Sequence, residues 1–146
     1  QPAPSVLDLL TEEAALGVTG YDYYRDFGDR VQALKEALLT KLATLKGEGC
    51  RLAAYGAAAK ATVLLNYFGI GAETLEFVAD RSDYKRGRYI PGVRLPITPP
   101  EKLLEAMPDY VLLLTWNFAA EILQQQAEYR RRGGRFIVPI PKLEVV

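Results

Sequence analysis

Residues 51–69, RLAAYGAAAKATVLLNYFG, decide the fold because a short apolar run meets a helical run at a glycine. The first run, RLAAYG, is typical of a buried strand, and residues 58–68 are typical of a helix that Gly69 ends. The turn between them, YGAAAK (55–60), would direct free backbone N–H groups and the positive end of the helix dipole toward an anion. Two interpretations stay open: a nucleotide site, or a tight turn that only packs the helix on the sheet.

The alternation of strands and helices continues to the end of the chain. Further strands are expected at LEFVAD (75–80), RLPIT (94–98), YVLLLT (110–115) and RFIVPI (135–140), with helices at 99–106 and 118–131. The last two strands are apolar almost throughout, which is typical of a parallel sheet buried on both faces. The pattern predicts an α/β fold: a Rossmann-like three-layer domain with a parallel five-stranded sheet in the order 3-2-1-4-5.

A helical segment precedes this domain. Apolar residues recur every three or four positions from Tyr24 to Lys46, which predicts a helix that buries one stripe. We expect residues 1–47 to form an N-terminal helical lead-in and residues 48–146 to form the Rossmann-like domain, the two packing as one compact unit. The chain opens on glutamine rather than methionine, and we interpret it as a cut inside a longer protein.

Two helix starts carry capping signals. The stretch TPPE (98–101) predicts a capping box, with Thr98 as N-cap, Pro99 at the first helical position and Glu101 three residues after the threonine. Asn117 is expected to cap the next helix in a similar way.

The composition excludes several classes of function. Eighteen basic residues balance eighteen acidic ones, so no overall field attracts nucleic acid or an anionic membrane. The chain has no histidine and a single cysteine, Cys50, so it cannot by itself build a disulfide, a zinc site or a histidine-based mechanism. It shows neither a long apolar run nor a signal peptide, which favours a cytoplasmic setting and no membrane partner.

The candidate binding residues lie where a doubly wound sheet collects its ligands, outside the carboxyl ends of the strands. Five cations and two tyrosines in the loop 81–94 suggest a phosphate clamp with a stacking ring from Tyr84 or Tyr89, although a charged, solvated loop is the plain alternative. Asp80 would grip a ribose or simply end a strand. We predict eight substrate-binding residues: Tyr55, Gly56, Lys60, Arg86, Arg88, Tyr89, Trp116 and Asn117.

Several ordered motifs resemble the C-terminal domain of the sugar C-methyltransferase family. They are YGAAAKATVLLNYFGI (55–70), VADRSDYKRGRYIPGVRLPI (78–97), PDYVLLLTWNFAAEILQQQ (108–126) and GGRFIVPIP (133–141). Together with the helix start YRDFGDRV (24–31), the likeness covers about residues 5 to 141. The family resembled consists of S-adenosylmethionine-dependent enzymes that methylate a carbon of nucleotide-linked keto-deoxysugars.

The resemblance implies a three-part protein of which this chain is the last part. A zinc-binding portion and a middle domain, which binds S-adenosylmethionine and carries the catalytic residues, would lie upstream as the partner of this domain. The chain itself would face the nucleotide-sugar, hold no cofactor or metal, and not methylate alone. Two other classes stay open: a free-standing Rossmann-type nucleotide-binding or sensor module, and a structural interaction domain.

Overall fold

The computed structural model describes residues 2–146, which form two compact units that divide between Lys35 and Glu36. The first unit contains helices α1 (Pro4–Ala15) and α2 (Tyr21–Tyr24) and the start of α3 (Phe27–Gly47). Neither α1 nor α2 buries any of its side chains. No helix within the described residues is long and apolar enough to cross a bilayer.

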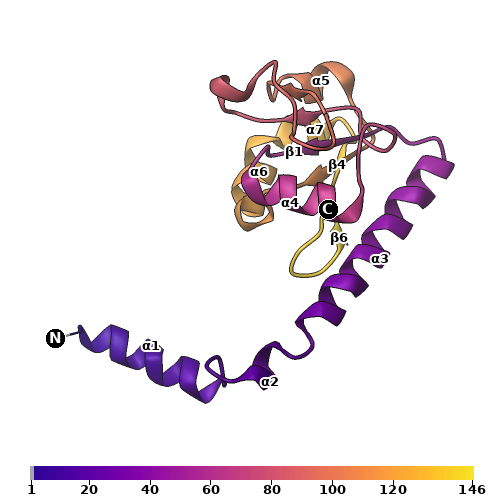
Figure 1. The fold of residues 1–146 in the computed structure, drawn as a ribbon. Helices are drawn as coiled ribbons and strands as arrows, with labels where there is room; N and C mark the ends of the chain where they lie inside the picture. Colours follow the sequence, from indigo (N-terminus) through magenta and orange to yellow (C-terminus); the bar gives the residue numbers. More distant parts are fainter. Residues whose placement is uncertain (1) are drawn as a thin grey trace. The chain divides into compact units, whose positions relative to one another are not determined.

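The second unit is built around a six-stranded sheet in the order β3-β2-β1-β4-β5-β6. Strands β1, β4 and β6 of this sheet are labelled in Figure 1. The strands are β1 (Leu52–Tyr55), β2 (Val78–Ala79), β3 (Ile97–Thr98), β4 (Tyr110–Leu113), β5 (Arg135–Val138) and β6 (Glu144–Val145). The first five are parallel, whereas β6 runs antiparallel to β5. The α/β class and the order of the five parallel strands are therefore confirmed.

The expectation of a purely parallel, five-stranded sheet is wrong. After β5 the chain turns back, and Phe136 and Val146 exchange backbone hydrogen bonds. This return places β6 on the outer edge of β5. Both residues of β6 are exposed, so the sequence there carries no alternation of apolar and polar residues from which a strand could be predicted.

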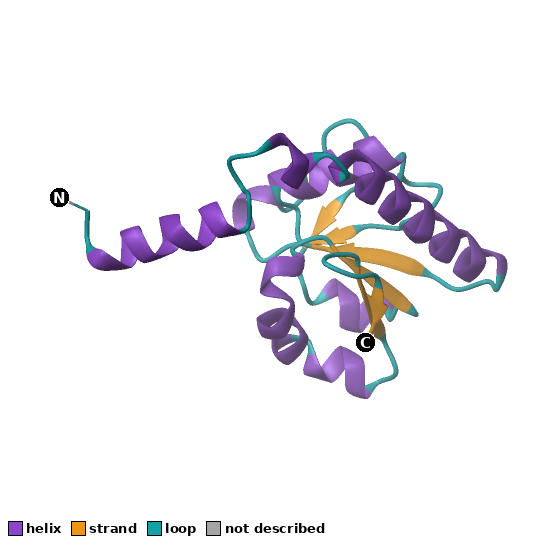
Figure 2. Cartoon of the chain, turned by 90° about the horizontal axis from the view of Figure 1, so that it is seen from below, coloured by secondary structure: helices purple, strands orange, loops and turns teal. Residues whose placement is uncertain are grey.

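Helices cover both sides of the sheet (Figure 2). They are α4 (Ala59–Phe68), α5 (Lys102–Ala106), α6 (Ala119–Gln125) and α7 (Ala127–Arg131), together with the end of α3. Alternate residues of the strands pack with Leu103, Ile122 and Tyr129 from α5, α6 and α7 into one buried cluster. The Tyr129 hydroxyl donates a 2.6 Å hydrogen bond to the Pro108 carbonyl, which ties α7 to the start of β4.

Both capping predictions are wrong. Thr98 ends β3, its hydroxyl is buried without a hydrogen-bond partner among the described residues, and α5 starts only after Glu101. Asn117 lies inside a 3₁₀ turn, Trp116–Phe118, and the N-cap of α6 is Phe118. The helix expected over 118–131 is also divided, because Gln126, with φ −96° and ψ 26°, separates α6 from α7.

Candidate functional site

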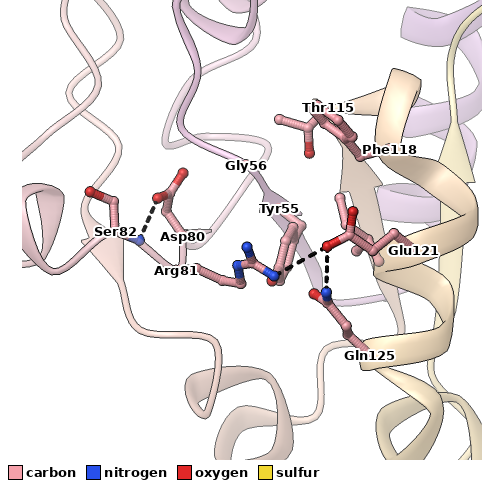
Figure 3. A pocket seen from close by; sticks show the side chains of 10 residues that line it. Tyr55, Gly56, Asp80, Arg81, Ser82, Thr115, Phe118, Glu121 and Gln125 are labelled. Carbon is pink, nitrogen blue, oxygen red and sulfur yellow. Dashed lines mark hydrogen bonds and ion pairs between the residues drawn. The ribbon is translucent and has the colours of Figure 1, made fainter.

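A pocket of about 460 Å³ opens at the carboxyl ends of β1, β2 and β4 (Figure 3). This is the edge at which doubly wound sheets bind their ligands. The residues that line it are Tyr55, Gly56, Asp80, Arg81, Ser82, Thr115, Phe118, Glu121, Ile122 and Gln125. Three strand ends and one face of α6 thus supply the walls.

Gly56 and Thr115 make the floor of the pocket tight. Gly56 has a φ of 98°, and a Cβ built on it would lie 2.5 Å from the Thr115 side chain. The Gly56 amide donates to the Ala79 carbonyl, and the Leu114 amide donates to the Tyr55 carbonyl. Only glycine therefore fits at position 56, for reasons of backbone conformation and of space, whether or not a ligand binds.

Asp80 fastens the turn after β1 to the loop after β2. Its Oδ2 accepts a 2.6 Å hydrogen bond from the Ala57 backbone amide, and its Oδ1 accepts a 2.8 Å bond from the Ser82 amide. Lys85 lies 3.3 Å from Oδ2 and balances the charge of this mostly buried carboxylate. Asp80 thus occupies a backbone donor next to α4 that a ligand anion would otherwise use.

Two hydroxyls in the pocket are buried and lack a hydrogen-bond partner within residues 2–146. They belong to Tyr55, which is 3% exposed, and to Thr115. Burial raises the pKa of Tyr55, while the Arg81 charge acts in the opposite direction; Gln126 lies near the phenol without meeting hydrogen-bond geometry. A buried polar group without a partner is costly. These two hydroxyls are therefore unsatisfied groups at the pocket wall, and a polar group of a ligand would reach them only after neighbouring side chains move aside.

One ion pair joins the strand ends to α6. The Arg81 guanidinium lies 3.3 Å from Glu121 Oε1, which also accepts a 2.6 Å hydrogen bond from Gln125 Nε2 (Figure 3). Phe118 lines the same pocket and is 55% exposed, so a planar group could pack on its ring. The pocket thus combines a charged pair, an aromatic ring and two buried hydroxyls that have no partner in the described part of the chain.

The structure brings three of the predicted residues together in a cluster outside the pocket lining. The Lys60 ammonium lies 4.4 Å from the centre of the Trp116 ring and donates to the Asn117 side-chain oxygen. We name Lys60, Trp116 and Asn117 the Lys60 cluster. Because Lys60 already contacts both Trp116 and Asn117, a ligand would have to compete with these side chains for the ammonium group.

The remaining predicted residues divide between the pocket and the loop. Tyr55 and Gly56 line the pocket, whereas Arg86, Arg88 and Tyr89 do not. Arg86 pairs with Asp83 at 2.6 Å, and Arg88 and Tyr89 are exposed on the loop. Their role in binding stays a prediction.

The eight predicted substrate-binding residues leave out five polar pocket residues, Arg81, Ser82, Thr115, Glu121 and Gln125, of which Arg81 belongs to the loop predicted as a phosphate clamp. Thr115 is the last residue of one expected strand and Arg81 directly follows another, so their positions could have marked them. Glu121 and Gln125 are four residues apart on α6 and share a face. Nothing in the sequence shows that this face, rather than another, meets the strand ends.

Comparison with known proteins assigns the chain to a family. The family model for the C-methyltransferase C-terminal domain matches residues 1–141. The chain belongs to this family. C-methyltransferase NovU from Streptomyces niveus is 38% identical over 143 residues, which make up 98% of this chain and 34% of that relative. The C-methyltransferase C-terminal domain described here thus spans about a third of the length of the curated relative it matches.

The residues at the strand-to-helix turn of this C-methyltransferase C-terminal domain do not fit S-adenosylmethionine, the methyl donor that the family implies. The acid that would accept from a ribose is Asp80, but its side chain is only 11% exposed, each of its oxygens accepts a backbone hydrogen bond, and Lys85 lies 3.3 Å from Oδ2, which leaves little room for ribose hydroxyls. Thr115 fills the space beside Gly56. Among the described residues, no three aspartate, glutamate or cysteine side chains gather as metal ligands either.

Proposed function

We propose that this chain is the substrate-side domain of an S-adenosylmethionine-dependent C-methyltransferase that acts on a nucleotide-linked keto-deoxysugar. The family match supports the methyltransferase part of the proposal. The observation that carries the substrate-side part is the pocket, which has at its wall two buried hydroxyls without partners among the described residues and one ion pair, all at the ligand-binding edge of the sheet. A sugar-nucleotide has the hydroxyl, carbonyl and phosphate groups that such a pocket can bind.

The task of this domain is to bind and orient the substrate and to exclude water from it. Tyr55 and Thr115 would bind uncharged oxygens, and Phe118 would pack on a ring. An upstream domain would bind the methyl donor and supply the groups that move protons, since this chain has no histidine and its turn does not fit the donor. Correct orientation of two bound reactants is itself a large source of rate enhancement.

Three expectations accompany the proposal. The isolated chain should transfer no methyl group and should bind S-adenosylmethionine weakly if at all. Its partner should be the upstream domain and not a nucleic acid or a membrane. The whole protein should work in the cytoplasm. The rival proposal is a free-standing nucleotide-binding module. The surroundings of Asp80 argue against a dinucleotide in that module, because burial, two backbone donors and Lys85 restrict access to the acid that would bind a ribose.

The proposal can be tested by filling the pocket in the full-length protein that carries this chain. Gln125 lines the pocket, and the substitution Gln125→Trp would fill much of it. We expect this variant to lose binding of a nucleoside-diphosphate sugar, measured by calorimetry, and to lose methyl transfer, measured with labelled donor. Affinity for the donor itself should not change.

The matched control is Gln124→Trp, which adds the same side chain at an exposed neighbour on α6 outside the pocket lining. It should bind and methylate like the wild type. If Gln125→Trp also binds the sugar-nucleotide like the wild type while remaining folded, the pocket is not the substrate site and the proposal fails. Separately, a micromolar dissociation constant of S-adenosylmethionine for residues 1–146 alone would contradict the proposal that an upstream domain binds the methyl donor.

A further inference from the structure

The pocket lining carries two acidic residues and one basic residue, whereas a phosphate site is expected to carry an excess of basic residues. Arg81 is the one basic residue among the described lining residues, whereas Asp80 and Glu121 are both acidic. Asp80 is neutralised by Lys85 and by backbone donors. The charge of Arg81 is taken up by Glu121. An anion entering this pocket would therefore meet a cation that is already paired.

Arg81 can leave Glu121 for another anion at a low cost in stability. Its side chains are 63% and 55% exposed, and the closest approach is 3.3 Å. Exposed pairs of this kind contribute little to stability, so Arg81 can leave without unfolding the domain. Glu121 would keep its place after Arg81 leaves, because Gln125 still donates to the same oxygen.

A phosphate competes with a carboxylate for arginine on favourable terms. A diphosphate carries more charge than Glu121 and offers several acceptor oxygens in a geometry that matches the guanidinium fork. An uncharged nucleoside or sugar has nothing that displaces the carboxylate. The pair therefore discriminates between phosphorylated and unphosphorylated ligands.

We propose that Arg81 is the residue that binds the phosphate of the ligand and that Glu121, held by Gln125, competes for it and so sets selectivity and affinity. The inference rests on the proposed function and makes it specific: the substrate must bring enough negative charge to take Arg81 from Glu121. Tyr55 and Thr115 bind the uncharged part of the same ligand. Glu121 thus acts against binding, and its loss strengthens the phosphate contact.

The test is a nuclear magnetic resonance titration of residues 1–146 with inorganic pyrophosphate, with uridine diphosphate and thymidine diphosphate, and with the two unphosphorylated nucleosides. Arg81→Gln should weaken the three phosphate probes by roughly 10- to 100-fold, as expected for lost charge-assisted hydrogen bonds. Glu121→Gln should tighten them by roughly two- to fivefold, the size of an exposed ion pair. Neither variant should change the affinity of the nucleosides.

Two further variants serve as controls. Glu128→Gln removes one carboxylate of the same kind from α7, where it pairs with Arg131 and Arg132 away from the pocket lining, and should leave all affinities unchanged. In the double variant Arg81→Gln/Glu121→Gln, most of the gain from Glu121→Gln should disappear. Amide spectra of each variant confirm that it is folded.

Three results would overturn the inference. Glu121→Gln could weaken the phosphate probes as Arg81→Gln does, which would make Glu121 a support for Arg81. Arg81→Gln could bind phosphate like the wild type, or the wild type could bind none of the phosphate probes. The proposed function is judged apart from these, by the effect of Gln125→Trp on methyl transfer in the full-length protein.

Discussion

Two groups of polar side chains follow the strand ends of this domain, and they differ in how far their hydrogen bonds are satisfied. In the Lys60 cluster, the ammonium, the indole ring and the carboxamide bind one another. In the pocket, the Tyr55 and Thr115 hydroxyls are buried without a partner in the described chain. Both groups contain residue types that bind ligands, but the buried hydroxyls without a partner among the described residues lie in the pocket, whereas Lys60 already binds Asn117 and the Trp116 ring.

The difference shows that residue type alone does not mark a binding site. A charge-bearing residue whose partners belong to its own chain is already stabilised, and a ligand must replace that interaction before it gains anything. A buried hydroxyl without a partner is already desolvated, so a ligand that reaches it gains the full hydrogen bond. Substitutions in the pocket and in the Lys60 cluster should therefore differ in their effects on stability and on ligand binding.

Gly56→Ala should have the largest effect, lowering the free energy of unfolding by about 3–5 kcal/mol through a strained backbone and a crowded side chain. The new Cβ would lie 2.5 Å from the Thr115 side chain at a φ of 98°. Urea denaturation measures the loss. Gly69→Ala is the matched control, because Gly69 has a φ of 71° and open space around it; it should lose only about 1 kcal/mol. Equal losses in the two variants would show that crowding at Thr115 does not matter.

Asp80→Asn should lower the free energy of unfolding by about 2–3 kcal/mol, because an amide cannot accept from Ala57, Ser82 and Lys85 as a carboxylate does. The exposed Asp83, which pairs only locally with Arg86, provides the comparison. Asp83→Asn should change stability by less than about 0.5 kcal/mol. If both variants unfold at the same urea concentration, Asp80 does not fasten the turn to the loop.

Tyr55→Phe should leave stability unchanged or raise it by about 1 kcal/mol, since it removes a buried hydroxyl that has no partner. Tyr129→Phe should act in the opposite direction, because it deprives the buried Pro108 carbonyl of its donor. Chemical denaturation of both variants at neutral pH shows whether each substitution raises or lowers the free energy of unfolding. Destabilisation by Tyr55→Phe as large as that by Tyr129→Phe would mean that the Tyr55 hydroxyl is satisfied after all.

The same tyrosine predicts a pH dependence. Burial raises the pKa of Tyr55 in the folded chain, so its contribution to stability is complete below the unfolded value of about 10 and is lost as the pH rises toward the folded value. The stability advantage of Tyr55→Phe over the wild type should therefore grow above about pH 10. Denaturation midpoints measured across this range check the trend, and a constant difference would contradict it.

Lys60→Ala should lower the free energy of unfolding by about 0.5–1 kcal/mol, because it removes the contact of a half-buried cation with the half-buried Trp116 ring. Trp116 is the only tryptophan of the chain, so its fluorescence reports directly on the Lys60 cluster. The emission of the variant should change, while its affinity for uridine diphosphate should equal that of the wild type. Weakened binding would place the ligand at the cluster instead of the pocket.

The sequence predicted the parallel core well because its strands are buried and its turns are marked. The runs around Leu52–Tyr55 and Tyr110–Leu113 are apolar on both faces, and Gly56 and Gly69 mark the ends of two elements. The sequence did not predict strand β6, because its two residues are both exposed and show no alternation of apolar and polar positions. The capping box failed because Thr98 pairs with Ala79 in the sheet, and strand pairing took precedence over local capping chemistry.

The sequence predicted where the candidate site lies, but not most of the residues that line it. The carboxyl edge of the sheet follows from topology, and Tyr55 and Gly56 were found in this way. Arg81 and Glu121 are forty residues apart, and their contact depends on how α6 lies against the strand ends. Likewise, the attachment of Asp80 to the turn after β1 is a tertiary hydrogen bond that no local pattern reveals.

The most direct test of the central claim, that the pocket with Arg81 and Ser82, and not the Lys60 cluster or the rest of the loop (83–94), meets the ligand, is to map the amide shifts of residues 1–146 during titration with uridine diphosphate. We expect the largest shifts at Gly56, Ser82 and Thr115 and on the face of α6 that carries Glu121 and Gln125, with the Trp116 indole N–H little changed. Shifts concentrated at Lys60, Trp116 and Arg88, with the pocket amides unmoved, would contradict the account.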